Sequence, residues 1–292
     1  MLAADEIPAL HPDQLVAWLR RIGIAEVPDA PTLPVLNTLI AAQLAHIPFE
    51  NLDALLGRRV SIDLPSVFEK LVAQGRGGYC FEQNTLLCAG LKALGYAVTP
   101  LAARVRWHVP EATPTGLSHM LLRVEVAHES YIADVGFGGP TPDRALSLSL
   151  PPDENTPYRL HPSPANALTG TGFHCLDLTV PDVTDDASGW QPIYRFDLTP
   201  QPWIDFIARN WYVSTHPDSH FTRTLMAART DGDTRLALAN GNLSERSPDG
   251  SVRKTALASA DAVIDTLATR FQIRLDPALR AALAARLPAV LG

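Results

Sequence analysis

Apolar residues in the first third of the chain recur at the spacing of an amphipathic helix. Positions 15, 18, 19 and 22 are all apolar and lie on one helix face, and Gly23 ends this pattern. A second helix is predicted to start after Thr32, a favourable N-cap residue, and to end just before Pro48, because proline disfavours the helical conformation in the residue that precedes it. Two further helices are predicted over 66–72 and 80–94. The first third is therefore expected to be helical.

The middle third changes to short segments rich in residues that favour β-structure. Prolines recur from 140 to 164, and the polar segment 182–189 is expected to be a surface loop. Several short strands at this spacing indicate a barrel or a sandwich rather than alternating strands and helices. The strands are predicted over 101–107, 120–126, 131–135, 173–180 and 193–198.

The last third mixes both kinds of pattern. A strand is predicted over 234–239, followed by a turn at Asn240-Gly241. Apolar residues at 264, 267 and 271 share one helix face, and Asp276-Pro277 is a typical start for a terminal helix. The whole pattern predicts an α+β protein.

Composition narrows the class of protein. The 292 residues are 46% hydrophobic and 19% charged, which is enough apolar surface for sizeable cores. With 24 Lys and Arg against 31 Asp and Glu, the net charge of −7 argues against nucleic acid as the main partner. No apolar run approaches the ~20 residues of a membrane span, and no secretory signal is recognisable at the N-terminus. Three cysteines suit a reducing compartment. We therefore expect a cytoplasmic enzyme or binding protein.

The segment Gly75-Arg-Gly-Gly-Tyr-Cys80 carries the clearest chemical signal. Its three glycines permit a tight turn with positive φ angles, and a helical pattern then begins at Cys80. Unpaired N–H groups in the first turn of a helix favour an anion, so a thiolate and a developing oxyanion would both be stabilised there. The alternative is a buried structural cysteine, and that interpretation is preferred for Cys88 and Cys175, which have no glycine turn.

A nucleophilic thiol needs a base, and the base needs an acceptor that orients it. His119 opens an alternating run, and Asp134 follows a predicted turn at Ala127-His128. A tight hairpin centred on this turn would place Asp134 opposite Leu121 and diagonal to His119 on the same face. A slip of one residue would separate the two side chains, and each alone also fits an ordinary structural role in a strand.

These residues fall in segments that resemble the arylamine N-acetyltransferases. The intervals between Cys80, His119 and Asp134 also match that family, and the resemblance runs from about Ala17 to Phe221. The motifs are Arg76-Gly-Gly-Tyr-Cys-Phe-Glu-Gln-Asn84, His46-Ile-Pro-Phe-Glu-Asn-Leu-Asp53, Asp134-Val-Gly-Phe-Gly138 and Asn210-Trp-Tyr-Val-Ser-Thr-His-Pro-Asp-Ser-His-Phe221.

The resemblance implies a fold and a mechanism. The fold is a helical bundle over 1–95, a β-barrel-like domain over 96–200 and an α/β lid over 201–292, with a core like that of cysteine proteases. The mechanism is ping-pong: Cys80 takes the acetyl group of acetyl-CoA, His119 moves the protons, Asp134 orients His119, and an arylamine or hydrazine accepts the acetyl group. The resemblance implies no metal.

The resemblance also implies binding residues. An aromatic acceptor would be lined by Phe49, Val105 and Phe137. Arg76 and Glu82 are expected to be structural, because buried charges usually pair. Family contacts to coenzyme A fall on Thr115, Gly116, Gly136, Gly138 and Ser219.

Three alternatives stay open. An amide synthase that releases or cyclises a polyketide-type acyl chain would use the same triad. A cysteine protease or a transglutaminase-like enzyme would share the triad chemistry but needs no segment like 46–53. A ligand-binding module without activity is a third possibility, which an intact triad disfavours.

Overall fold

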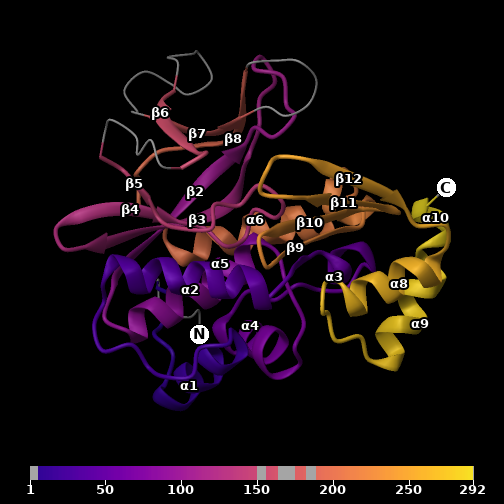
Figure 1. Cartoon of the computed structure of the whole chain (residues 1–292), viewed down its shortest axis with the longest axis horizontal. Helices are drawn as coiled ribbons and strands as arrows, with labels where there is room; N and C mark the ends of the chain where they lie inside the picture. Colours follow the sequence, from indigo (N-terminus) through magenta and orange to yellow (C-terminus); the bar gives the residue numbers. More distant parts are fainter. Residues whose placement is uncertain (1–5, 150–155, 164–174, 182–188, 292) are drawn as a thin grey trace.

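The computed structural model describes residues 6–149, 156–163, 175–181 and 189–291. Helices from the first third lie against one side of a seven-stranded sheet, and a five-stranded sheet with its own helices lies beside both (Figure 1). This arrangement confirms the predicted α+β class with a barrel-like central sheet. The division at 95/96 and 200/201 stays a prediction. Within the described ranges, no helix is long and apolar enough to cross a membrane.

The helices of the first third begin and end close to the predicted positions. Thr32 caps α2 by accepting a hydrogen bond from the N–H of Val35. The segment predicted over 66–72 is an α-helix that continues as one π-helical turn. The elements are α1 (Pro12–Arg21), α2 (Leu33–His46), α3 (Leu52–Leu55), α4 (Leu64–Phe68), η1 (Glu69–Ala73) and α5 (Cys80–Ala93).

Helix α5 is the central helix of the fold. Every residue from Cys80 to Leu91 is buried, including several polar ones. Neighbouring elements approach it closely: a Cβ at Gly90 would lie 2.4 Å from the Trp18 ring of α1. The polar residues are tolerated because they are bonded; for example, the amide of Gln83 donates to the carbonyls of Ile47 and Pro48. A helix surrounded in this way holds its first turn in a fixed place.

The seven-stranded sheet is antiparallel throughout, in the order β5-β4-β3-β2-β8-β7-β6. Residues 182–188 of the predicted loop over 182–189, residues 173–174 of a predicted strand and parts of the proline-rich stretch lie outside the described residues. The strands are β2 (Ala97–Val105), β3 (Leu117–Val126), β4 (Glu129–Ala133), β5 (Leu146–Ser147), β6 (Arg159–Pro162), β7 (Leu176–Pro181) and β8 (Trp190–Phe196).

The five-stranded sheet combines one strand from the first third of the sequence with four strands from the last third. Its order is β1-β9-β10-β11-β12, and β1 (Phe49–Glu50) comes from the first third, with Phe49 paired to Ala228. The predicted turn at Asn240 is present and has a positive φ. The other elements of this part are α6 (Trp203–Thr215), α7 (His220–Arg223), β9 (Met226–Asp231), β10 (Thr234–Ala239), β11 (Asn242–Arg246), β12 (Val252–Ala256), α8 (Ala260–Thr269), α9 (Pro277–Arg286) and α10 (Pro288–Leu291).

Candidate active site

Cys80 is the first residue of α5, as the sequence predicts. The glycine turn before it differs from the expectation, because only Gly75 has a positive φ. Gly77 and Gly78 are needed for close packing instead: a Cβ at Gly77 would lie 2.1 Å from the Pro48 carbonyl oxygen, and Gly78 forms a bridge with Phe49. The turn is therefore fixed against β1 by backbone contact.

His119 and Asp134 come together through the β3–β4 hairpin. The hairpin turns at Ala127 and His128, which both have positive φ, and Leu122 pairs with Ala133. This is the predicted register, continued one residue past the end of β4 to Asp134. His119 Nε2 lies 2.7 Å from Asp134 Oδ2, and both side chains are buried.

Asn84 joins this pair to α5. Its side-chain amide donates to Asp134 Oδ1 at 2.9 Å, and its carbonyl oxygen accepts the N–H of Val135 at 3.1 Å. The N–H of Gly136 donates to the same Asp134 oxygen at 2.8 Å. Sequence reasoning missed this role of Asn84, although the residue closes the motif around Cys80. The helix that carries the thiol is thus bonded directly to the acid.

The electrostatics of the pair favour an imidazolium. Burial lowers the pKa of His119, but the charge and hydrogen bond of Asp134 and then the contact with Cys80 raise this pKa to about 10. Burial raises the pKa of Asp134, but the charge and hydrogen bond of His119 hold it below its ordinary value. Cys80 is one of the groups that raise the pKa of His119, and its Sγ lies 3.8 Å from the carbonyl oxygen of Ser118.

Two aromatic rings hold the imidazole. Tyr194 of β8 stacks on His119 with ring centres 5.1 Å apart, and Phe137 meets the ring edge-on at 5.2 Å. Tyr194 is fully buried, and burial followed by the charge of Asp134 raises the pKa of its phenol well above the ordinary value. Sequence reasoning did not single out Tyr194, because β8 gives no local signal of where its residues pack.

The three predicted acceptor-pocket residues lie in different surroundings. Phe137 is half-buried beside His119. Phe49 packs against Gly138, whose Cβ would lie 3.6 Å from the ring, and against the ring of Phe221. Val105 lines a cavity of about 510 Å³ between the end of β2, the start of β3 and α6.

The predicted coenzyme-binding residues also lie in different parts of the structure. Thr115 and Gly116 line the same cavity as Val105, and so does Ser118, whose carbonyl approaches Cys80. Gly136 packs against Cys80 itself, since a Cβ there would lie 2.5 Å from the Cys80 Cα. Gly138 has a positive φ beside Phe49. Ser219 is the N-cap residue of α7, where its hydroxyl donates to the Val213 carbonyl.

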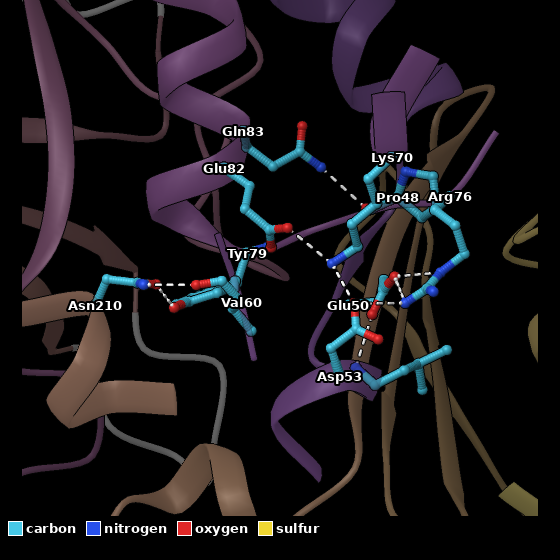
Figure 2. A network of polar contacts seen from close by, with 11 residues as sticks. Pro48, Glu50, Asp53, Val60, Lys70, Arg76, Tyr79, Glu82, Gln83 and Asn210 are labelled. Atoms are coloured by element: carbon cyan, nitrogen blue, oxygen red, sulfur yellow. Dashed lines mark hydrogen bonds and ion pairs between the residues drawn. The ribbon is translucent and has the colours of Figure 1, made fainter. Parts of the chain in front are cut away.

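A buried ionic network includes Arg76 and Glu82, which lie on either side of Tyr79 in the sequence (Figure 2). Arg76 pairs with Glu50 at 2.7 Å and with Asp53 at 3.1 Å. Glu82 pairs with Lys70 at 2.7 Å. Arg76 and Glu82 are both paired, as expected for structural charges, but with partners that sequence reasoning did not identify.

The other two cysteines differ from Cys80 in their surroundings. Cys88 is fully buried, and burial raises its pKa to about 12. Cys175 is half-buried, and burial followed by the charge of Asp197 raises its pKa. Among the described residues, no histidine contributes to the pKa shift of either thiol.

A cysteine at a helix start, joined to a histidine and a buried aspartate, is the arrangement of enzymes that use a thiol nucleophile. A family model described as N-acetyltransferase matches residues 32–280. The arylamine N-acetyltransferase of Mycobacterium bovis is 40% identical over 285 residues, covering 95% of each chain. That of Escherichia coli is 35% identical, covering 83% of this chain and 84% of its own.

Solved structures agree with these matches. The arylamine N-acetyltransferase of Mycobacterium marinum superimposes with a TM-score of 0.85 at 37% identity, covering 95% of this chain and 100% of its own. The same relative in complex with CoA gives the same TM-score. The chain therefore belongs to the arylamine N-acetyltransferase family of acyltransferases.

Proposed function

We propose that this enzyme transfers an acetyl group from acetyl-CoA to an arylamine or arylhydrazine through an acetyl-Cys80 intermediate. The observation that carries the proposal is the buried His119–Asp134 pair at 2.7 Å, joined through Asn84 to α5, whose first residue is Cys80. The relatives' names and the CoA complex of the Mycobacterium marinum enzyme support the choice of substrates.

The residues account for each step of the transfer. The Cys80 thiolate attacks the thioester carbonyl carbon, the C–S bond to coenzyme A breaks, and the coenzyme thiolate leaves with a proton from His119. The amine nitrogen then attacks the acetyl-Cys80 carbonyl carbon and gives a proton to His119. The C–S bond to Cys80 breaks, so that the amide product forms and Cys80 leaves as the thiolate. N–H groups of the first turn of α5 would stabilise the oxyanion of both tetrahedral intermediates.

The cavity of about 510 Å³ is the proposed entry for acetyl-CoA. Ser118 connects the cavity to Cys80, and Thr115 and Gly116 line it. Arg209 of α6 also lines the cavity; its Nη1 and the Thr115 hydroxyl have no hydrogen-bond partner among the described residues. Arg209 Nη2 donates to Gln201 Oε1 at 2.8 Å, which leaves Nη1 and the Thr115 hydroxyl to bond a phosphate of the coenzyme.

The remaining predicted contact residues are proposed to act in different ways. Phe137 beside His119 suits a flat aromatic acceptor, whereas Phe49 packs against Phe221 and Val105 lines the cavity. Gly136 and Gly138 would act through close packing rather than as ligands, because their neighbours are Cys80 and Phe49. Ser219 would have to release its bond to Val213 to contact the coenzyme.

Two-substrate kinetics test this proposal. Acetyl-CoA is varied at several fixed concentrations of an aniline, and a ping-pong reaction gives parallel double-reciprocal lines. Cys80→Ala is expected to abolish turnover, whereas Cys88→Ala, which changes a buried thiol outside the site, is expected to keep it. Failure to turn over acetyl-CoA with any simple arylamine or hydrazine would reject the proposal and favour an amide synthase that uses the same triad.

A further inference from the structure

In the ionic network of Figure 2, Glu82 is bonded both to Lys70 and to Tyr79, the residue before the nucleophile. Glu82 Oε2 accepts the backbone N–H of Tyr79 at 3.1 Å, and Oε1 accepts the ammonium of Lys70 at 2.7 Å. The Glu82 side chain is only 1% exposed. The peptide before Cys80 is therefore held by a carboxylate whose position depends on a buried cation.

Lys70 anchors this carboxylate to a second part of the fold. Its ammonium also lies 2.7 Å from Asp53 Oδ2 of α3, and Asp53 pairs in turn with Arg76. Lys70 belongs to η1, a π-helical turn; such turns are rare and are frequent at functional sites. Lys70 thus links the start of α5 to α3 across the Cys80 turn.

The Cys80 turn has almost no room to move independently of this link. A Cβ at Gly78 would lie 2.7 Å from Glu82 Oε2, and a Cβ at Gly136 would lie 2.5 Å from the Cys80 Cα. Gly77 lies against the Pro48 carbonyl on the remaining side. A shift of the Glu82 carboxylate would therefore be transmitted to the turn and to Cys80.

We propose that the Lys70–Glu82 ion pair is a positioning device for the nucleophile: it fixes the N–H of Tyr79, and so holds Cys80 in the orientation that faces His119. The proposal rests on the proposed role of Cys80 as nucleophile. Neither residue lines the cavity proposed for acetyl-CoA, so both are proposed to act through the backbone of the turn. A misplacement of about 1 Å in such a group lowers a rate by roughly 10²-fold.

The charge balance of the network makes the ion pair sensitive to pH. Burial raises the pKa of Glu82, Lys70 opposes this and Glu50 adds to it, so that the pKa is about 7. Below that pH Glu82 takes up a proton and its attraction for Lys70 weakens. His119, with a pKa of about 10, does not titrate in this range. The charged and titratable groups around Glu82 are Lys70 of η1, Glu50 of β1, Asp53 of α3, Arg76 of the glycine turn, and Tyr79 and Cys80 at the start of its own helix.

The experiment measures the rate of Cys80 alkylation by iodoacetamide against pH, followed by peptide mass spectrometry. In the native enzyme the rate is expected to rise through about pH 7 as Glu82 ionises. In Glu82→Gln the amide oxygen cannot serve both the Tyr79 N–H and Lys70, so the rate is expected to be at least about tenfold lower and to lack that rise.

Three further variants separate positioning from folding. Lys70→Met is expected to behave like Glu82→Gln, and Lys70→Arg, which keeps the charge, is expected to recover most of the rate. Glu245→Gln makes the same change on a carboxylate of β11, which pairs with Arg270 and Arg253 rather than with the network, and is expected to leave the rate and its pH profile unchanged. Slow alkylation of Cys88 in each variant reports that the fold is intact.

The outcomes distinguish this inference from the proposed function. Folded Glu82→Gln and Lys70→Met proteins with the native rate and native pH profile would overturn the positioning role while leaving Cys80 as nucleophile. If Glu82→Gln does not fold, the test rests on Lys70→Arg and Lys70→Met. Equal alkylation rates of Cys80 in these two variants would also overturn the positioning role. A native enzyme whose Cys80 is not acetylated by acetyl-CoA would instead reject the proposed function.

Discussion

The contact between Gly136 and Cys80 gives a sharp test of the site. A Cβ added at Gly136 would lie 2.5 Å from the Cys80 Cα and 2.9 Å from Asn84 Nδ2, whereas ordinary contacts begin at 3.4 Å. Gly136→Ala must therefore separate α5 from the segment after β4 by roughly 1 Å at this point. The same segment carries Asp134, so the separation changes the geometry between Cys80 and His119.

The expected magnitude follows from that displacement. A shift of about 1 Å in a reacting group costs roughly 10²-fold in rate, and overpacking a buried contact costs about 1–3 kcal/mol of stability. We expect Gly136→Ala to fold, with a lower midpoint of thermal unfolding, and to form acetyl-Cys80 about 10²-fold more slowly. Rapid-quench acetylation of Cys80 in a single turnover measures this rate without any contribution from the acceptor.

Neighbouring glycines provide matched controls. A Cβ at Gly139 would lie 3.7 Å from its nearest neighbour, Ala237, which is an ordinary contact. Gly139→Ala is therefore expected to acetylate at the native rate. A Gly136→Ala enzyme that acetylates as fast as Gly139→Ala would refute the reasoning, because the close approach of Gly136 to Cys80 would then have no part in holding the site.

Three other predictions use the same structure. Because burial raises the pKa of Cys88 to about 12, only about one molecule in 10⁵ carries its thiolate at pH 7, so brief iodoacetamide treatment should modify Cys80 and spare Cys88 on a peptide map. The pKa of His119 is raised to about 10, so the His119–Asp134 pair stabilises the fold fully below about pH 6.5, and this stabilisation is lost as the pH rises through about 10. The difference in unfolding free energy between the native enzyme and a His119→Gln/Asp134→Asn variant should therefore shrink over that range. A difference that stays constant with pH would contradict this prediction. Arg209→Gln should raise the KM for acetyl-CoA by about 10-fold or more but leave acetylation by p-nitrophenyl acetate, which has no phosphates, unchanged; equal effects on both donors would argue against a phosphate contact.

The elements of the site were predictable from local signals. The helix start at Cys80 follows a glycine-rich turn, and the hairpin at Ala127-His128 fixes the register that brings Asp134 next to His119. Both signals depend only on residues that are close together in the sequence, so they can be recognised without the structure. The motif resemblance then selects these three residues from other cysteines, histidines and acids.

What the sequence did not reveal depends on contacts between distant segments. Strand β1 is only two residues long and pairs with β9, which follows the whole seven-stranded sheet in the sequence, so no periodicity marks it. Tyr194 stacks on His119 because β8 lies beside β2, which only the sheet order determines. Gly77 and Gly78 were expected to supply positive φ angles, but they are required by close packing against β1 and Glu82.

The central claim is that Cys80 carries the acetyl group between the two substrates. The most direct measurement is a peptide mass spectrum after incubation with acetyl-CoA and again after addition of an arylamine. The account predicts one acetyl group on the peptide that contains Cys80, none on those with Cys88 or Cys175, and its loss when the amine is added. An unmodified Cys80, or an acetyl-Cys80 that the amine does not discharge, would contradict it.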